Sequence, residues 1–541
     1  MKKLNLGKYN LIGYGAMLLA FLLDFYVTLP ALNIHSNGFW SHILVYLVLG
    51  AVFSLPIGKK HWPVDFRFKK MSVLTKIWAV LVGICIFVLL FGNILSSPLF
   101  HSKKYASLIQ VETSNFEEDI RESEDISDIA LMDTASAQII GERAIGSLAD
   151  VVSQYVVSDE YTTFDYNGRP MKIATLEYAD WFKWFNNRKE GIPGYVLVDP
   201  VTNEAKYVEL ETPIKYTKSG HFGDKLERHL RYQYPTAIFE GYYLELDNEG
   251  KPYYICPTMT AKIGIFGAQD VKGVVICDPT NGDCQYYDVK DVPGWVDRVY
   301  DGTLVQKKYD WYGMYSGGFF NSIIGNKGCK VTTDDYGYKV MNGDVWIYTG
   351  VTSINGDESN IGFVLINLRT CECKYYEIAG AEEYSAMSSA EGQVQHLGYT
   401  AAFPSLINID GSPTYIMVLK DNAGLVKMYA MVNVQKYNIV ATGSTQKEVL
   451  SEYKRLLKDN GIISKDQFAT ENMPSKKITI ADIKFITADG ETVVYIKDTE
   501  NRVYKQNFSE NESLILLNVG DIITVYYEES DGDIKELLSY K

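Results

Sequence analysis

Histidine is scarce in this chain, and the sequence motifs of the common hydrolases and nucleotide-binding enzymes are missing. Only 7 of the 541 residues are histidine. There is no His-Glu-x-x-His, no Gly-x-Ser-x-Gly and no glycine-rich phosphate loop, which would supply a zinc site, an activated serine or a phosphate cradle. A Ser-x-x-Lys sequence at 451–454 lacks the companion motifs of the serine enzymes that use it. We therefore expect no catalytic residues, no metal and no cofactor.

An excess of positive charge is also missing. The chain carries 52 Lys and Arg against 67 Asp and Glu, a net charge of −15. The first hundred residues are basic, so residues 101–541 are more acidic still. An acidic surface of this kind argues against nucleic acid and anionic lipid as partners.

Long apolar runs are confined to the first hundred residues. They extend from Leu11 to Leu32, from His42 to Ile57 and from Ile77 to Leu95. The first and third reach the roughly 20 residues that cross a bilayer, and aromatic residues extend the second at its edge. We expect a three-helix membrane anchor over residues 1–100; for the first run, the alternative is a cleaved signal peptide.

The loops between these runs predict the orientation of the chain. The 58–72 loop contains Lys59, Lys60, Arg67, Lys69 and Lys70, whereas residues 33–41 contain no Lys or Arg. The positive-inside rule places the N-terminus and the 58–72 loop in the cytoplasm, and everything after about residue 97 outside.

One carboxylate falls within an apolar run. Asp24 lies in the first run, where a charged group is costly and often functional. We expect Asp24 either to contact a partner membrane protein or to be satisfied by water or by Asn93 of the third run.

One hairpin sequence recurs three times outside the apolar region. It reads "GYVLVDPVTNEAKYVEL" at 194–210, "GVVICDPTNGDCQYYDV" at 273–289 and "GFVLINLRTCECKYYEI" at 362–378, with a fainter copy at 428–442. The Asp or Asn before each turn can accept hydrogen bonds from the turn backbone. A second hairpin precedes each copy, at 164–176, 244–258, 338–350 and 406–419. Helical periodicity in the gaps predicts helices there, one of them at 175–188. The pattern predicts an α+β chain of repeated modules, each a helix with two hairpins, whose sheets stack.

These paired hairpins resemble the strand pairs of PepSY domains. That family has a Val-Asp-x-x-Thr-Gly-Glu-Val type of turn; Asp199 and Gly282 match it, while Asn203, Asn367 and Cys371 depart from it. The whole chain also resembles multi-pass membrane proteins of Gram-positive bacteria with a large extracytoplasmic domain. The resemblance implies modules that bind or restrain other envelope proteins, and it transfers no catalytic residue. The expected segments are an anchor at 1–100, a juxtamembrane segment at 101–160, modules at 161–235, 236–325, 326–400 and 401–470, and a small β-barrel-like domain at 471–541.

Six of the seven cysteines lie in the part expected outside the membrane. If the 273–289 hairpin turns around residues 279–282, Cys277 faces Cys284 and a cross-strand disulfide is possible, with free thiols as the alternative. Cys371 and Cys373 lie on one strand face, where they form a redox pair, disulfides to other cysteines, or two free thiols. No cysteine spacing matches a zinc motif.

A short basic stretch interrupts the acidic part of the chain. The sequence "DKLERHLRYQYP" at 224–235 contains Lys225, Arg228, His229 and Arg231. We expect it to contact an anionic envelope polymer or an acidic partner, unless it is an ordinary solvated amphipathic helix. The leading hypothesis is a membrane-anchored, extracytoplasmic binding or regulatory protein of the cell envelope. The alternatives are an envelope thiol oxidoreductase or hydrolase, and a scaffold of a membrane complex.

Overall fold

The computed structural model describes residues 8–55, 72–123, 126, 129–354, 359–463, 474–488, 491–508, 511–528 and 534–540. The chain is α+β, with apolar helices at the N-terminus and several antiparallel sheets, as predicted. It divides into two compact units, Met1–Leu456 and Leu457–Lys541. The basic residues Lys59 to Lys70, which predict the orientation, lie outside the described residues.

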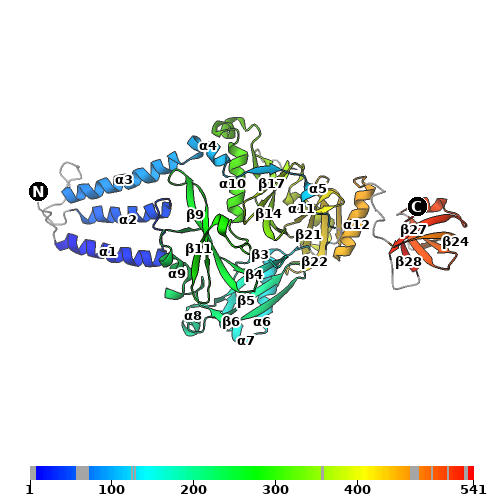
Figure 1. Ribbon diagram of the computed structural model, residues 1–541, viewed down its shortest axis with the longest axis horizontal. Helices are drawn as coiled ribbons and strands as arrows, with labels where there is room; N and C mark the ends of the chain where they lie inside the picture. Colours follow the sequence, from blue (N-terminus) through cyan, green and yellow to red (C-terminus); the bar gives the residue numbers. More distant parts are fainter. Residues whose placement is uncertain are drawn as a thin grey trace. The chain divides into compact units, whose positions relative to one another are not determined.

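Three apolar helices form one end of the first unit: α1 (Lys8–Thr28), α2 (Asn37–Phe53) and α3 (Val73–Leu95). Helices α1 and α3 are long and apolar enough to cross a membrane, and α2 is a shorter apolar helix. Figure 1 shows them side by side, with α2 between the other two. Almost none of the α1 and α3 side chains are buried. Helices that expose apolar side chains all round suit lipid and not water.

Four sheets of the first unit have the same strand order. In each, two short strands pair with one edge of a long strand. The other edge of the long strand pairs with a fourth strand, and the fourth pairs with a fifth. The first sheet contains β2 (Tyr155–Val157), β3 (Thr162–Tyr166), β4 (Arg169–Tyr178), β5 (Ile192–Asp199) and β6 (Glu204–Ile214). The second contains β7 (Ile238–Phe239), β8 (Tyr243–Leu246), β9 (Pro252–Ile263), β10 (Gly267–Cys277) and β11 (Cys284–Asp288).

The third and fourth sheets repeat this arrangement with small additions. The third contains β12 (Lys330–Thr332), β13 (Gly337–Met341), β14 (Asp344–Ser353), β16 (Gly362–Asn367) and β17 (Cys373–Tyr376), and β1 (Val111–Thr113) joins β17 in parallel. A two-stranded ladder of β15 (Ser359–Asn360) and β18 (Gly380–Ala381) adjoins it. The fourth contains β19 (Thr400–Ala401), β20 (Ser405–Ile409), β21 (Ser412–Lys420), β22 (Val426–Asn433) and β23 (Val440–Gly443).

The turns of these sheets follow the predicted chemistry. Asp199, Asp278, Asn367 and Asn433 each accept a hydrogen bond from a backbone N–H two or three residues further on. In the preceding hairpins of the first, third and fourth sheets, the two central turn residues both have positive φ, for example Asn167 and Gly168. Such a two-residue turn matches the twist of the strands that it joins.

Helices separate and cover the sheets. They are α4 (Pro98–Ala106), α5 (Phe116–Asp119), α6 (Thr134–Gly146), α7 (Ala149–Val152), α8 (Trp181–Asn187), α9 (Leu226–Gln233), α10 (Gly302–Tyr315), α11 (Glu383–Gln393) and α12 (Gln446–Asp459). The predicted helix at 175–188 begins too early, because residues 175–178 belong to β4. Helix α8 starts only after Asp180, whose carboxylate accepts from the Lys183 N–H.

Successive sheets share their cores. Along β10, Val274 and Ile276 pack with the third sheet and α10, whereas Val275 and Cys277 pack with the first sheet and α9. This alternation follows from the period of two in a strand, since neighbouring side chains point to opposite faces. The second sheet is therefore buried on both faces, and the third shares its other core with the fourth.

Among the residues described there, the second unit is all β apart from the last residues of α12 and one short 3₁₀ helix at Glu512–Leu516. Its strands are β24 (Ser475–Ala488), β25 (Glu491–Asp498), β26 (Val503–Asn507), β27 (Ile522–Glu528) and β28 (Ile534–Tyr540). They pair in a closed ring, in the order β24, β25, β26, β28, β27. Ile480, Ile496 and Tyr504 are among the residues of its buried core.

Candidate functional site

The hairpin of β10 and β11 brings Cys277 and Cys284 together, as the sequence predicts. The two residues are direct cross-strand partners, and their sulfur atoms lie 2.7 Å apart. Cys277 is buried in the core between the first and second sheets, while Cys284 is partly exposed. Directly paired strand residues have Cα atoms within the range that a disulfide requires.

Helix α9 places His229 beside this pair. The helix lies where it does because Leu226 and Leu230, four residues apart on one face, are buried in the same core as Cys277. One His229 ring nitrogen lies within 4.8 Å of both sulfur atoms. The imidazole Nε2 also lies 2.7 Å from the carbonyl oxygen of Gly282, and the Tyr216 ring packs against it with centroids 4.0 Å apart.

The two thiols differ in acidity. The pKa of Cys284 is lowered to about 6, first by the hydrogen bond with Cys277 and then by His229, against the opposing effect of burial. The pKa of Cys277 is raised by the same hydrogen bond and by burial. The pKa of His229 is raised, first by Cys284 and then by the Gly282 carbonyl, against the effect of burial. At neutral pH the reduced site therefore holds a Cys284 thiolate next to His229, whose pKa the thiolate raises.

This arrangement supports three kinds of chemistry. A partly exposed thiolate is a nucleophile, and a second sulfur in contact can resolve a mixed disulfide. Oxidation of the pair gives a cross-strand disulfide. Two sulfurs and one imidazole are also soft ligands that suit Zn²⁺, which would leave a fourth position for another ligand. Among the described residues, His229, Cys277 and Cys284 form a set of potential ligands that the cysteine spacing alone does not reveal.

Gly282 makes this close approach possible. Its φ is +86°, and a Cβ atom at this position would lie 2.5 Å from the Tyr216 ring and 2.8 Å from His229 Nε2. Only glycine adopts this conformation without strain and leaves room for both rings.

Two of the predicted partner-binding residues are used inside the molecule instead. Arg228 and Arg231 are buried, at 8% and 7% exposure. Arg228 Nε and Nη2 donate to the Tyr26 carbonyl at 3.3 and 3.1 Å, and Arg231 Nε donates to the Leu29 carbonyl at 2.9 Å. These carbonyls lie at the C-terminal end of α1, where helix carbonyls lack partners within the helix. Arg228 and Arg231 thus form an arginine clamp on α1. Of the four predicted contact residues, Lys225 and His229 remain partly exposed.

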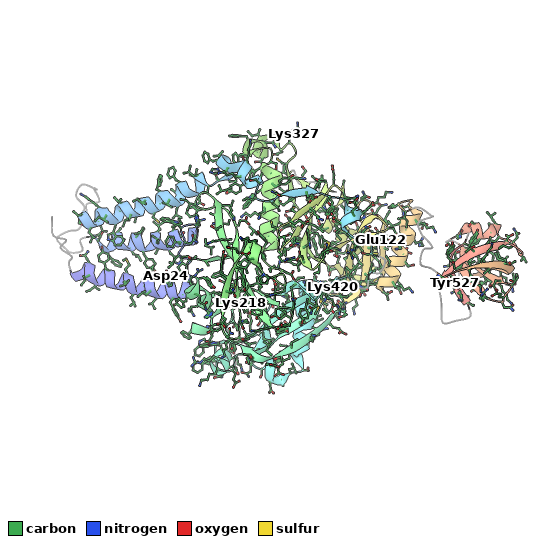
Figure 2. All side chains as sticks on the ribbon, viewed as in Figure 1. Asp24, Glu122, Lys218, Lys327, Lys420 and Tyr527 are labelled. Carbon is green, nitrogen blue, oxygen red and sulfur yellow. The ribbon has the colours of Figure 1, made fainter. Side chains whose placement is uncertain are left out.

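Asp24 and Asn93, which the sequence suggests as a pair, have other partners in the structure. Asp24 (Figure 2) lies 3.6 Å from Nε2 of His42 in α2 and has no contact with Asn93 among the described residues. Asn93 donates instead to Asn37 at 3.2 Å and to the Leu89 carbonyl at 2.7 Å. The sequence does not predict the contact between Asp24 and His42. His42 begins the second apolar run, and a histidine at the edge of such a run indicates no particular partner.

The second cysteine pair lies where β16 meets β17, with Cys371 in the turn and Cys373 as the first residue of β17, so the two do not share a strand. Cys371 has a φ of +62°, in the position that Gly282 occupies in the second sheet. Burial raises the pKa of Cys371 and of Cys373. Buried thiols with raised pKa react slowly, so these two residues form a poorer redox pair than Cys277 and Cys284.

Comparisons with known proteins add no assignment. No protein-family model matches the chain, and no curated protein matches it. Among the solved structures, a levansucrase variant from B. megaterium aligns with 78% of this chain and 97% of its own length, at 9% identity and a TM-score of 0.15. A similarity this weak carries no conclusion about fold or activity.

Proposed function

We propose that this protein is a membrane-anchored, extracytoplasmic binding or regulatory protein of the cell envelope, built from PepSY-like modules. Its partner would be another envelope protein. Four sheets with one strand order support the modular part of the proposal. The apolar helices support the anchor, and the ring of strands in the second unit suits a small barrel-like domain that serves as a spacer or protein contact.

The arginine clamp is the observation that supports a regulatory role for the protein. It joins a folded domain to the end of a helix that is apolar enough to span a membrane. The loop between α1 and α2 adds backbone contacts, since the Leu32 N–H donates to the Pro235 carbonyl at 2.8 Å. Binding at the domain would thus be transmitted to α1 through packed groups and not through a flexible linker.

Partner recovery with a clamp variant tests this proposal. The full chain would be purified from detergent-solubilised membranes as wild type, as Arg228→Met and as Lys225→Met. We expect wild type and the Lys225→Met control to recover the same envelope protein, and Arg228→Met to lose most of it. Recovery of nothing above a mock purification, or equal recovery by all three chains, would contradict the proposal.

The thiol site favours a second candidate, an envelope thiol oxidoreductase. The Cys284 thiolate would attack a substrate disulfide and release one substrate thiol. Cys277 would then attack the mixed disulfide, which releases the second thiol and leaves Cys277 and Cys284 joined. Two substrate sulfurs are reduced and two protein sulfurs oxidised, so the electrons balance.

A single-turnover assay tests this candidate. The reduced chain is mixed with excess glutathione disulfide, and the thiols released are counted. The oxidoreductase predicts two thiols for each wild-type chain, a trapped mixed disulfide for Cys277→Ala, and no reaction at this site for Cys284→Ala. Equal release from wild type and Cys284→Ala would eliminate it.

A further inference from the structure

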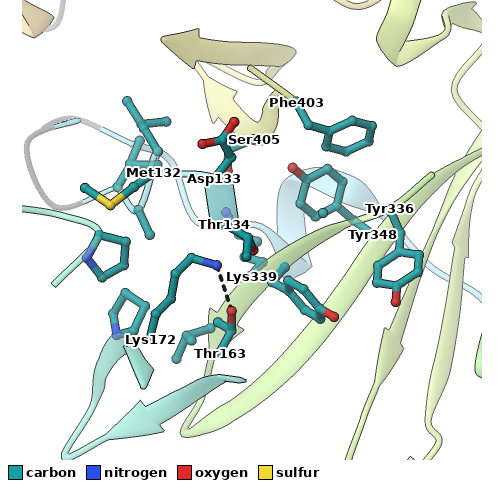
Figure 3. Close-up of a pocket in the computed structure, with 18 of the residues that line it drawn as sticks. Met132, Asp133, Thr134, Thr163, Lys172, Tyr336, Lys339, Tyr348, Phe403 and Ser405 are labelled. Atoms are coloured by element: carbon teal, nitrogen blue, oxygen red, sulfur yellow. Dashed lines mark hydrogen bonds between the residues drawn. The ribbon is translucent and has the colours of Figure 1, made fainter. Parts of the chain in front are cut away.

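A cavity of about 370 Å³ lies where the first, third and fourth sheets meet. Its wall includes Thr163 and Lys172 of the first sheet, Lys339 of the third and Ser405 of the fourth, closed by residues 129–134. Figure 3 shows these side chains converging from separate strands. The volume falls within the range of small-molecule sites, and junctions between structural layers are common places for them.

Two lysines of this wall have no carboxylate counter-ion among the residues that the structure describes. Lys172 is 5% exposed, and its Nζ donates to Thr163 Oγ1 at 2.9 Å. Lys339 Nζ donates to the Leu406 carbonyl at 3.1 Å. Within the part of the chain that the structure describes, neither ammonium group forms an ion pair with a carboxylate. Burial lowers the pKa of both lysines to about 8, and the neighbouring charge of Arg298 adds to the effect at Lys172.

The carboxylate of the cavity wall is already neutralised by other groups. Asp133 accepts from the Ser136 N–H at 2.9 Å as the N-cap of α6. Its other oxygen lies 2.5 Å from Lys420 Nζ. Hydrogen bonds from Lys420 and Ser136 hold its pKa below the usual value, although burial acts in the opposite direction. The charge of Asp133 is thus matched by Lys420, and Lys172 and Lys339 leave the wall positive.

The rest of the wall combines aliphatic with aromatic side chains. Tyr336, Tyr338, Tyr348 and Phe403 line it, and Figure 3 shows Tyr348 and Phe403 across the cavity from Lys172. Positive groups at one side and ring faces at the other suit a ligand with a charged end and an apolar body. Buried ammonium groups without a counter-ion are unfavourable, and an anion that enters the cavity relieves that cost.

We propose that this cavity binds a small organic anion. Its carboxylate or phosphate group pairs with the ammonium groups of Lys172 and Lys339, and its uncharged part packs against Tyr338, Tyr348 and Phe403. Because three sheets contribute to the wall, an occupant ties them together. The site is independent of the side of the membrane on which the domain lies and of the chemistry of Cys284.

Covalent labelling with pyridoxal 5′-phosphate tests the site, since this probe combines a phosphate, an aromatic ring and an aldehyde. A lysine amine adds to the aldehyde carbon with loss of water, and borohydride hydride reduces the imine to a stable amine. The full chain in detergent micelles at pH 8 is labelled briefly and mapped by peptide mass spectrometry. We expect Lys172 and Lys339 to react at least tenfold faster than the exposed Lys189.

Competition identifies the charged group that the cavity prefers. Inorganic phosphate and benzoate are each added before the probe. Protection of Lys172 and Lys339 by phosphate indicates a phosphate site, and protection by benzoate a carboxylate site, with Lys189 unaffected in both. Labelling that follows surface exposure, or that neither anion slows, overturns the proposal.

Variants separate anion binding from folding. Lys172→Met and Lys339→Met keep the length of the side chain without its charge, and Lys189→Met is the matched surface control. With whichever anion protects, we expect a rise in melting temperature for wild type and Lys189→Met, and none for the two cavity variants. If either folded cavity variant keeps the full rise, the cavity lysines do not bind the anion.

Discussion

The guanidinium group of Arg228 lies over the ring of Tyr26, 4.0 Å from its centroid, while its Nη2 donates to the carbonyl of the same residue at 3.1 Å. One side chain of the folded domain thus satisfies a terminal carbonyl of α1 and stacks on its aromatic neighbour. A positive group at a helix C-terminus also interacts favourably with the helix dipole. These contacts make Arg228 a structural residue of the junction between α9 and α1.

Arg228→Met should loosen that junction. Loss of the charged donor leaves the Tyr26 carbonyl unpaired, which typically costs about 2–3 kcal/mol. We expect faster amide hydrogen exchange in α9 and at residues 29–35, with the four sheets unchanged. Lys225→Met, one turn away and partly exposed, should leave exchange as in wild type. Equal exchange in the two variants would show that the clamp does not hold α9 in place.

Gly282→Ala should disrupt the thiol site. The new methyl group meets Tyr216 and His229 and is held at a φ of +86°, so we expect a loss of about 2–3 kcal/mol in unfolding free energy. Gly168→Ala is the matched control, because its φ is +83° but nothing lies within 4 Å of the added carbon. Gly168→Ala should lower the free energy of unfolding only by the cost of the left-handed backbone conformation, about 1 kcal/mol. Chemical denaturation monitored by circular dichroism measures both, and similar losses would mean that crowding at Gly282 is unimportant.

Cys284 should be the most reactive thiol of the reduced protein. With a pKa of about 6, its alkylation by iodoacetamide should reach half its maximal rate near pH 6 and level off by pH 7. His229→Gln removes a side chain that lowers the pKa of Cys284, so the midpoint should move upward towards the ordinary thiol value of about 8.5. Peptide mapping at a series of pH values gives the rates. A midpoint above 8 in wild type, or one that His229→Gln leaves in place, would contradict the proposed effect of His229 on the Cys284 thiolate.

Lys172→Met should stabilise the empty protein most at neutral pH. The Lys172 amine has a pKa of about 8 in the folded protein and about 10.4 in the unfolded chain. Below pH 8 the buried charge therefore lowers the free energy of unfolding by its full amount. Between these values the unfolded chain binds more protons, and wild-type stability rises with pH. The advantage of the variant, about 3 kcal/mol at pH 7 from a shift of this size, should shrink by most of that amount at pH 10. Denaturant unfolding at pH 7, 8, 9 and 10 measures it, and a constant difference would show that Lys172 does not titrate early.

The hairpins and their turns are the features that the sequence predicts best, because they depend on local chemistry. Asp278 and Gly282 define the turn between β10 and β11. This turn sets the register that pairs Cys277 with Cys284. The strand at 176–178 is harder to predict, since tertiary pairing with β2 overrides its local helical pattern.

The residues that meet across the fold are the ones that the sequence conceals. His229 lies next to the cysteines because α9 packs against the core that contains Cys277. The sequence spacing between His229 and the cysteines does not predict this contact. Arg228 and Arg231 are three residues apart and share a helix face, but basic residues on a short helix usually face solvent. The burial of Lys172 could be predicted from the alternation along the strand. Lys172 lies on the same strand face as Ala174 and Leu176, which are both buried.

The central claim is that the domain following α3 lies outside the cytoplasm, on the same side of the membrane as the loop between α1 and α2. Cysteine accessibility in intact cells tests it most directly, with a membrane-impermeant maleimide applied to Lys189→Cys and Lys60→Cys in a chain whose native cysteines are replaced by alanine. We predict that Cys introduced in place of Lys189 is labelled in intact cells, and that the substitution at Lys60 is labelled only after lysis. Labelling of the Lys60 variant in intact cells, with the Lys189 variant protected until lysis, would contradict the account.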